Sequence, residues 1–385
     1  MRILFCSDTY PPQVNGVSVV TALSVAGLRE RGWEVEVVAP RYPRTMRSIF
    51  EPAADRERVT SIPSLPLPVY PDIRLAVPDA GAVRRVIARF RPDVVHSATE
   101  FVIGRLGQRA ALAAGIPATT SYHTDFAQYT ASYGVPFLRA PVSRWIQRFH
   151  RRAVRIFTPS APSRDALRAL GLTEVEVWGR GVDTQLFHPV KRSLAVRQRL
   201  SLGNAFTFLH VGRLAPEKGI EVLLDAFSIV ERELGAERVK FVIAGAGPSL
   251  SSLKARASST VTFVGNLDRA TELPALYASA DAFLFASVTE TLGLVVLEAM
   301  ASGTPVIATP AGGVADNLRD GVNGLAFPAM DARACAAAMR RLVLEREQLL
   351  GLRDGARRTA ERRSWRDELD RLDASYREVL SRSAP

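Results

Sequence analysis

Short apolar segments alternate with longer amphipathic segments along the whole chain. In the first half, the apolar segments predict strands at Arg2–Phe5, Glu34–Ala39, Val59–Ile62, Val94–His96, Ala118–Ser121, Ile156–Thr158 and Val175–Trp178. The amphipathic segments predict helices near residues 17–31, 79–89, 101–114, 138–152 and 162–170. Because short buried strands separated by helices are typical of parallel sheets, we expect a sheet with helices on both faces. The proline-rich segment Ile62–Pro71 is predicted to be an ordered surface loop.

A second alternating series begins after the segment Gly179–Pro189, whose glycines and proline interrupt the pattern. It predicts strands near Thr207–His210, Val239–Ala244, Val261–Val264, Ala282–Phe285, Pro305–Ala308 and Gly324–Ala326. Helices are expected near residues 219–234, 249–256, 272–278, 293–302, 331–349 and 366–381. The chain is therefore predicted to be an α/β protein with two Rossmann-like, doubly wound parallel-sheet domains, residues 1–180 and 181–365. In such folds ligands bind at the carboxyl ends of the strands, so we expect the two domains to face a cleft.

The net charge is +11 over 385 residues, and it is unevenly distributed. Residues 1–190 contain 24 basic and 16 acidic side chains, whereas the remainder contains 26 and 23. A basic face suits nucleic acid, an anionic lipid surface or a phosphorylated ligand. The sequence has no zinc-finger spacing, RNA-binding aromatic motif or basic helical repeat, so nucleic acid is not expected to be a partner.

The composition also predicts a cytoplasmic protein. The first residues, Met1–Asp8, form a brief apolar run that ends in a charge, which is typical of a strand and not of a secretory signal. No stretch approaches the roughly 18 apolar residues that a membrane-spanning helix needs. Cys6 and Cys335 lack the spacing of metal ligands or of a disulfide pair, so both are predicted to be buried thiols in a reducing compartment.

The segment Arg139–Arg155 is dense in arginine and contains several aromatic residues. Four of its arginines follow 4-3-4 spacing: Arg144, Arg148, Arg151 and Arg155. That spacing predicts one basic helical face with Trp145 and Phe149 beside it. Such a face suits an anionic bilayer, and would make the protein peripheral on the inner face of the cell membrane. A solvated arginine face over a packed apolar face is an equally good interpretation.

The stretch Thr289–Gly303 carries the most informative chemistry. Glu290 and Glu298 are eight residues apart, which is a little over two helical turns. Gly293 lies at the expected helix start, where free N–H groups and the helix dipole favour an anion. A ligand with a phosphate there and hydroxyl groups on either side would be a sugar nucleotide. The alternative is a capping acid followed by a second glutamate on the helix surface.

A loop after the predicted strand Thr207–His210 supplies two cations, Arg213 and Lys218. The loop ends at a helix start, so both side chains and the backbone amides there can converge on a diphosphate. Two cations on a pyrophosphate would remove the need for a metal ion. Alternatively, Glu217 and Lys218 are exposed at a turn and form a solvated pair.

Two further turns follow predicted strands and contain glycine. Gly16 lacks a Cβ, so a phosphate or sugar can approach the start of the first helix; an ordinary Asn-Gly turn is the alternative. The turn Val242–Pro248 lacks the third glycine and the downstream acid of a dinucleotide fingerprint. We therefore expect this turn to be a tight structural connection rather than part of a nicotinamide site.

His123 and Asp125 follow the predicted strand Ala118–Ser121. A histidine there can bind a sugar hydroxyl or a transferred proton near neutral pH. The alternative for His123 is a loop histidine bonded to a backbone carbonyl. Asp125 is a candidate for the acceptor side, but a helix N-cap explains it equally well.

Together and in this order, these motifs resemble glycosyltransferase family 4, whose members are retaining sugar-nucleotide transferases of the GT-B fold. The resemblance is carried by Asn15–Val17, Tyr122–Phe126, Gly181–Phe187, Val211–Gly219 and Thr289–Gly303. The family usually has Glu-x-Phe-Gly in its acidic motif, and Leu292 replaces the phenylalanine here. This exchange is expected to alter packing and bears on donor-sugar preference. The Asn15–Gly16 form of the first loop looks like the lipid-directed mannosyl- and sulfoquinovosyltransferase branch.

The resemblance implies a role for each matching residue. Arg213 and Lys218 would bind the donor diphosphate, aided by the loop that contains Gly16. Glu290 would contact the donor sugar, and Glu298 would hold the ribose hydroxyls. Three backbone amides would lie near the sugar and the phosphate, those of Leu292, Gly293 and Leu294.

The resemblance also implies the reaction. His123 would lie over the sugar from an acceptor-binding first domain, the second domain would bind the donor, and a final helix at about residues 366–385 would cross back to the first. The expected reaction is retaining transfer of a hexose, expected to be mannose from GDP-mannose, to a lipid or glycan hydroxyl. The alternatives are UDP-dependent glucosyl or sulfoquinovosyl transfer to a glycolipid, and a non-catalytic sugar-nucleotide-binding protein. Family members use neither a divalent metal nor another cofactor, and the sequence contains no Asp-x-Asp.

Overall fold

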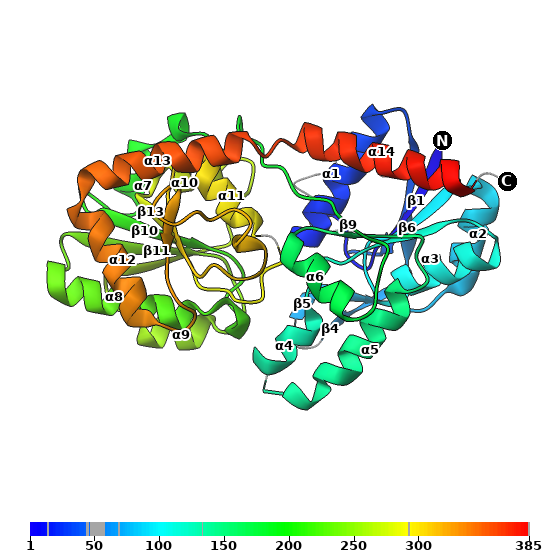
Figure 1. Ribbon diagram of the computed structural model, residues 1–385. Helices are drawn as coiled ribbons and strands as arrows, with labels where there is room; N and C mark the ends of the chain where they lie inside the picture. The colour runs from blue at the N-terminus through cyan, green and yellow to red at the C-terminus, as the bar shows by residue number, and fades with distance from the viewer. Residues whose placement is uncertain are drawn as a thin grey trace. The chain divides into compact units, whose positions relative to one another are not determined.

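The computed structural model describes residues 1–13, 15–43, 46, 58–67, 70–132, 134–291 and 293–383. The chain divides into two compact units. The first contains Met1–Ala127, Leu138–Gly179 and Arg366–Pro385, and the second contains Gln128–Phe137 and Arg180–Trp365. Each unit has a parallel sheet with helices on both faces (Figure 1). The predicted α/β fold with two doubly wound parallel sheets is therefore confirmed.

The sheet of the first unit has the order β3-β2-β1-β6-β7-β8-β9 and is parallel throughout. Its strands are β1 (Arg2–Cys6), β2 (Glu34–Pro40), β3 (Val59–Ile62), β6 (Val94–Ser97), β7 (Ala118–Ser121), β8 (Arg155–Thr158) and β9 (Val175–Val177). Strand order runs outward in both directions from the β1–β6 pair. In α/β proteins ligands bind beyond the carboxyl ends of the strands at such a reversal of strand order.

Most helices of this part of the chain follow the predicted amphipathic segments closely, but the short helical elements at Phe126–Ser132 and Pro136–Leu138 were not predicted. The helical elements are α1 (Gly16–Glu30), α2 (Ala80–Phe90), α3 (Val102–Ala113), α4 (Phe126–Ser132), η2 (Pro136–Leu138), α5 (Arg139–His150), α6 (Ala161–Ala169) and α14 (Trp365–Ser383). The last of these packs in the first unit, beside α1 (Figure 1). Leu369 of α14 fills the space where a Cβ on Gly27 of α1 would lie, and Trp33 Nε1 donates to Asp373 at 2.6 Å.

The prediction of a surface loop at Ile62–Pro71 is partly wrong. Residues Ser64–Leu67 form β4, which pairs with β5 (Tyr70–Ala76) in an antiparallel hairpin. Its prolines suggested a loop because a proline nitrogen cannot donate to a ladder. In a two-stranded sheet each strand has one unpaired edge, so Pro66 is tolerated there.

The sheet of the second unit has the order β12-β11-β10-β13-β14-β15 and is again parallel. Its strands are β10 (Phe206–Val211), β11 (Val239–Ala244), β12 (Val261–Gly265), β13 (Ala282–Phe285), β14 (Val306–Ala308) and β15 (Gly324–Ala326). Alternate residues point to opposite faces: Leu209 and Phe283 join one buried cluster, whereas Phe208 and Leu284 join the other. The strand order reverses between β10 and β13.

The helical elements of the second unit are η3 (Pro189–Lys191), α7 (Leu194–Arg199), η4 (Pro216–Lys218), α8 (Ile220–Leu234), α9 (Leu250–Arg256), α10 (Leu273–Ser279), α11 (Leu294–Ala301), η5 (Gly312–Val314), α12 (Ala332–Leu344) and α13 (Arg346–Glu361). The prediction of one continuous helix at 331–349 is wrong. Glu345 leaves the helical region, with φ −102° and ψ 80°, and therefore separates α12 from a further helix of 16 residues.

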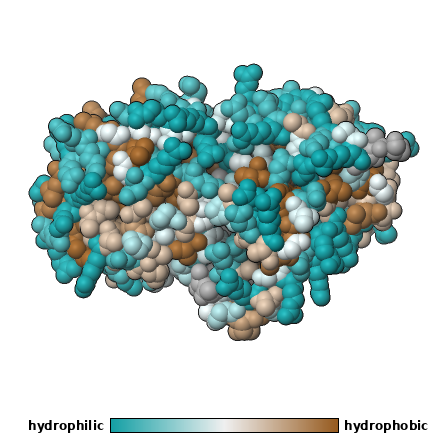
Figure 2. All heavy atoms as spheres, viewed as in Figure 1, coloured by the Kyte–Doolittle hydropathy of each residue, from teal (hydrophilic) through white to brown (hydrophobic). Residues whose placement is uncertain are grey.

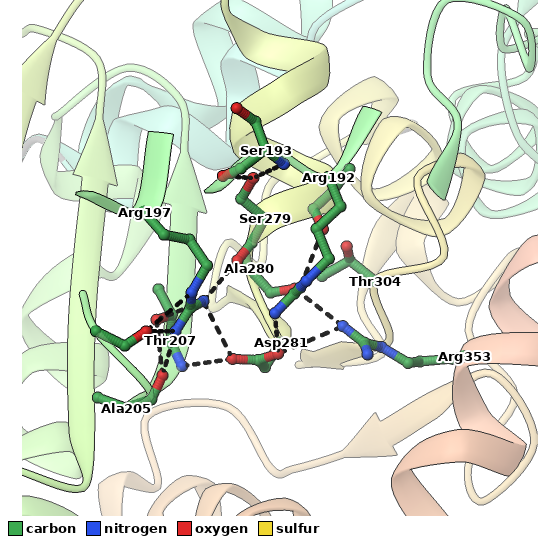
Figure 3. A network of polar contacts seen from close by, with 12 residues as sticks. Arg192, Ser193, Arg197, Ala205, Thr207, Ser279, Ala280, Asp281, Thr304 and Arg353 are labelled. Carbon is green, nitrogen blue, oxygen red and sulfur yellow. Dashed lines mark hydrogen bonds and ion pairs between the residues drawn. The ribbon is translucent and has the colours of Figure 1, made fainter. Parts of the chain in front are cut away.

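Three arginines converge on Asp281 at the amino end of β13 (Figure 3). Arg192, Arg197 and Arg353 place guanidinium nitrogens 3.5, 3.6 and 3.4 Å from its carboxylate oxygens. The same carboxylate accepts the backbone N–H of Thr207, next to the start of β10, at 2.9 Å. This cluster joins η3, α7 and α13 to the edge of the sheet opposite the carboxyl ends of the strands.

The visible face in Figure 2 is mainly hydrophilic, with smaller apolar patches between the charged residues, as on an ordinary folded domain. Within the described ranges, none of the helices combines the length and the apolar character required to span a bilayer.

Candidate active site

The predicted chemistry of the second unit gathers where its strand order reverses. Arg213 and Lys218 lie in the connection that leaves β10, and Glu290 lies in the connection that leaves β13. Because β10 and β13 are parallel neighbours, both connections emerge at the same edge of the sheet. Residues 72 apart in sequence are therefore brought together by topology.

Lys218 and Glu290 form a direct ion pair. Lys218 Nζ lies 2.7 Å from Glu290 Oε2, and 5.9 Å from the centre of the Phe285 ring. The two side chains are 14% and 22% exposed, so the pair is mostly buried but open to a ligand. Burial lowers the pKa of Lys218, but its interactions with Glu290, Tyr129 and Glu217 together more than offset this and leave the pKa raised. Lys218 is therefore a fixed cation at neutral pH.

Glycines allow the two connections to approach each other. Gly219 ends η4 with φ +64°, and a Cβ there would lie 3.0 Å from the carbonyl oxygen of Ala286. A Cβ on Gly312 would lie 2.0 Å from the carbonyl oxygen of Glu290, which also accepts the N–H of Gly313 at 2.8 Å. The backbone at Glu290 is thus fixed by the turn after β14.

The turn Val242–Pro248 is confirmed as a tight structural connection. A Cβ on Gly245, which has φ +134°, would lie 1.9 Å from the carbonyl oxygen of Gly212. A Cβ on Gly247 would lie 2.2 Å from that of Leu214. These glycines therefore let the connection after β11 pack directly against the loop that contains Arg213.

Arg213 is paired with Glu217, which is buried beneath it. The Glu217 side chain has no exposed surface, whereas the Arg213 side chain is 36% exposed. The suggestion that Glu217 and Lys218 are a solvated pair at an exposed turn is therefore wrong. The buried Glu217 carboxylate instead holds the guanidinium of Arg213 in place. The position of Glu217 between the two predicted cations did not indicate this role.

Glu298 lies on α11 and is almost completely buried. Arg269 Nε donates to its Oε1 at 2.9 Å, and the hydroxyl of Tyr277 donates to its Oε2 at 3.2 Å. The alternative of a glutamate on the helix surface is therefore wrong. Neither Arg269 nor Tyr277 was identified from sequence, because they lie 29 and 21 residues before Glu298 without any regular spacing.

The helix that carries Glu298 begins as expected. Gly293 precedes Leu294 as the N-terminal cap of α11, with φ +78° in the left-handed region. The first N–H groups of α11 follow at Leu294. The predicted contribution of Leu292 lies outside the described residues.

The predicted residues of the first unit also lie at carboxyl ends of strands. Asn15 caps α1 by accepting the N–H of Ser18 at 2.9 Å, and a Cβ on Gly16 would point into open space. His123 is half-buried in the connection after β7, and Asp125 immediately precedes α4. Gly16 and His123 therefore have backbone positions suited to a ligand at the carboxyl edge of their own sheet.

The proposed basic helical face of Arg139–Arg155 needs correction. Helix α5 ends at His150, and Arg155 is the first residue of β8. Its guanidinium pairs with Glu176 and with Glu378 of α14. The 4-3-4 spacing is therefore not helical at its end, because a turn and a buried Ala153 separate α5 from β8.

No group of three or more His, Cys, Asp and Glu side chains suited to a metal ion occurs among the described residues. The second unit presents Arg213 and Lys218 in the connection after β10, with Glu290 paired to Lys218 before α11 and Glu298 on α11 itself. This arrangement can neutralise a diphosphate and bind hydroxyl groups next to it.

Two family models match the chain. The model described as "Glycosyltransferase Family 4" matches residues 14–186, and the one described as "Glycosyl transferases group 1" matches residues 205–345. Together they include all the predicted site residues.

Relatives and solved structures match over nearly the whole length. A GDP-mannose-dependent alpha-mannosyltransferase from Mycobacterium tuberculosis is 34% identical over 99% of this chain and 98% of the relative. A sulfoquinovosyl transferase from Arabidopsis thaliana is 35% identical over 88% of this chain and 66% of the relative. The structure of sucrose-phosphate synthase from Thermosynechococcus elongatus superposes with a TM-score of 0.80 at 18% identity, covering 99% of each chain, which shows a shared fold.

Proposed function

Because the chain belongs to glycosyltransferase family 4, we propose that it transfers mannose from GDP-mannose to a lipid or glycan hydroxyl, with retention at the anomeric carbon. The chain is a glycosyltransferase; the donor, the acceptor and the stereochemistry are the proposed part. The observation that carries the choice of donor is the full-length similarity to the M. tuberculosis GDP-mannose-dependent enzyme.

The proposed donor site uses the charges at the reversal of the second sheet. Arg213 and Lys218 bind the diphosphate, with the start of α11 at Gly293 and Leu294 beside it. Glu290 contacts the sugar and Glu298 binds the ribose. Supporting this division, Glu290 lies next to Lys218 before α11 begins, whereas Glu298 is the fifth residue of α11, just over one helical turn beyond its start.

The proposed reaction proceeds on one face of the sugar. The bond between the anomeric carbon and the diphosphate oxygen breaks, and Arg213 and Lys218 stabilise the charge on the departing diphosphate. The acceptor oxygen bonds to the same face of the carbon, and its proton passes to the leaving diphosphate. His123, and on the acceptor side Asp125, contribute from the first unit. No metal or other cofactor takes part in this proposal.

UDP-dependent transfer of a glucosyl or sulfoquinovosyl group is the second candidate, supported by the similarity to the A. thaliana sulfoquinovosyl transferase. A panel of GDP-mannose, UDP-glucose and UDP-sulfoquinovose separates the two in a thermal-shift assay. A rise in melting temperature with GDP-mannose alone supports the mannosyl proposal, and a rise with only the UDP-sugars rejects it.

We further propose that the protein acts at an anionic membrane on the cytoplasmic side. Supporting this, α5 and the turn after it expose five arginines, Arg139, Arg144, Arg148, Arg151 and Arg152. Leu138, immediately before α5, is 39% exposed.

In co-sedimentation at low salt, Arg144→Glu/Arg148→Glu should abolish binding to phosphatidylglycerol vesicles, whereas Arg346→Glu/Arg358→Glu on α13 should not. Wild-type protein that stays in the supernatant would reject the membrane proposal.

A further inference from the structure

The carboxylate of Glu298 is contacted by side chains from two other segments of the second unit, those that carry Arg269 and Tyr277. Arg269 Nε donates to Oε1 at 2.9 Å, and Arg269 Nη2 lies 2.7 Å from the same oxygen. The Glu298 and Arg269 side chains are only 5% and 14% exposed. The contact is therefore a mostly buried ion pair in which one oxygen faces two guanidinium nitrogens.

Tyr277 contacts the second carboxylate oxygen of Glu298, Oε2. This fully buried side chain of α10 donates its hydroxyl to Glu298 Oε2 at 3.2 Å. Burial, and then the charge of Glu298, raise the pKa of Tyr277 well above its ordinary value, so the phenol remains a donor. A carboxylate has about four acceptor positions, and the contacts of Oε1 account for about two of them. Oε2 is the oxygen with room for a further donor.

The position of Arg269 is itself fixed by an aromatic ring. Its guanidinium lies over Phe187, 5.0 Å from the ring centre. Phe187 is fully buried and meets Tyr277 edge to face at 5.7 Å between centres. It is also the last residue of the Gly181–Phe187 segment. We refer to Phe187, Arg269, Tyr277 and Glu298 as the Glu298 cluster.

This arrangement has a physical consequence for ligand binding. A buried carboxylate that loses its cation is an uncompensated charge in a poorly solvated site, so Arg269 is needed to keep Glu298 in place. A hydrogen bond to a carboxylate whose position is already fixed requires little further ordering of the protein, which favours affinity. The cluster therefore prepares Glu298 before a ligand arrives.

We propose that Arg269 and Tyr277 are positioning residues that orient Glu298 so that Oε2 accepts a hydroxyl of the donor ribose. This inference rests on the proposed function, because it takes the ligand of Glu298 to be a nucleoside diphosphate. Arg269 and Tyr277 act through Glu298. Loss of either therefore reduces the preference for a ribose with hydroxyls over one without them.

The test measures that preference directly. Isothermal titration calorimetry gives the dissociation constants of GDP and 2′,3′-dideoxy-GDP, and of UDP and its dideoxy analogue; the tighter-binding base is used. Wild type should bind the ribonucleotide about tenfold or more tightly than its dideoxy analogue. Glu298→Gln should reduce this ratio to near one. Arg269→Ala should do the same, while Arg269→Lys and Tyr277→Phe should reduce it by a smaller factor.

Arg256→Ala is the matched control, because Arg256 is an exposed arginine of the same unit that pairs with Asp225. It should keep the wild-type ratio. A purely structural role for Arg269 or Tyr277 would weaken both nucleotides equally and leave the ratio unchanged.

The two failures are distinct. If wild type binds the ribonucleotide and its dideoxy analogue equally well, or if Glu298→Gln keeps the wild-type preference, the proposed donor assignment is wrong. If Glu298→Gln loses the preference but Arg269→Ala, Arg269→Lys and Tyr277→Phe all retain it, the positioning inference alone is overturned.

Discussion

Lys218 Nζ lies 2.7 Å from Glu290 Oε2, although the two residues are 72 positions apart in the sequence. The pair joins the connections after β10 and β13, the two strands between which the order of the second sheet reverses. It places a permanent cation next to a carboxylate at the point where α/β folds bind ligands. We propose that the cation binds the leaving diphosphate and that the carboxylate contacts the sugar.

Removing either partner should reduce transfer while leaving the fold intact. Lys218→Ala and Glu290→Ala should each lower kcat by about 100-fold or more, because charge stabilisation in the transition state is lost. Lys254→Ala is a control, since Lys254 is an exposed lysine on α9. Initial rates of nucleotide release, with circular dichroism as a check of folding, provide the measurement. Near-normal turnover in either site variant would reject the assignment.

Gly312→Ala should impair activity through Glu290. A Cβ at this position would lie 2.0 Å from the carbonyl oxygen of Glu290, so the backbone there must shift. Gly321→Ala is the matched control, because Gly321 also has a positive φ but nothing lies within 4 Å of its added Cβ. Left-handed strain should cost each variant about 1 kcal/mol of stability, and the backbone clash should make Gly312→Ala the less stable of the two. Only Gly312→Ala should also lose at least about tenfold in kcat, and equal rates in the two variants would contradict this explanation.

Asp281→Asn should destabilise the second unit. Three arginines, Arg192, Arg197 and Arg353, would remain around a neutral side chain. Breaking such a largely buried cluster should cost about 3 kcal/mol in the free energy of unfolding. Asp225→Asn, which removes an exposed partner of Arg256, should change it by less than about 1 kcal/mol. Urea unfolding of the two variants makes the comparison, and similar midpoints would show that the Asp281 cluster is not stabilising.

Acid should destabilise the protein through His210. Burial lowers the pKa of this residue from 6.5 to about 4, and its Nδ1 already donates to the carbonyl of Leu284. The unfolded chain therefore takes up a proton before the folded one. The contribution of the neutral His210 side chain to the free energy of unfolding is fully present above about pH 6.5. It falls as the pH drops towards 4, by up to about 3 kcal/mol.

The His210→Phe variant isolates this effect, because His210 already stacks with Phe283 and Phe285. The loss of the Leu284 bond should make the variant less stable at neutral pH. Its free energy of unfolding should nevertheless fall less steeply between about pH 6.5 and 4.5. A wild-type slope in the variant would exclude His210 as the acid-sensitive group.

Much of the fold could be predicted because buried parallel strands are short apolar runs between amphipathic helices. The predicted strand Ala282–Phe285, for example, coincides with β13. The hairpin β4–β5 was missed because prolines obscured a strand with a free edge. Helix α13 was missed because its glycines and charges break the apolar pattern before Glu361, and nothing in the composition near Glu345 marks the break.

The site could be predicted only in part. The charges Arg213, Lys218 and Glu290 are identified by short motifs after strands, which topology then brings to one edge. Their buried partners depend on tertiary packing. Arg269 reaches Glu298 from the connection after β12, and no sequence spacing encodes that contact. His123 and Glu290 lie in different units, and their cooperation stays a prediction.

We propose that this glycosyltransferase moves mannose from GDP-mannose with retention. The most direct measurement is an NMR spectrum of the product formed from GDP-α-mannose labelled at the anomeric carbon, with dioctanoylglycerol and octyl α-mannoside as acceptors. We expect an α-linked labelled mannoside, formed together with GDP and without added divalent metal. A β-linked product, or transfer that occurs only when a UDP-sugar replaces GDP-mannose, would contradict it.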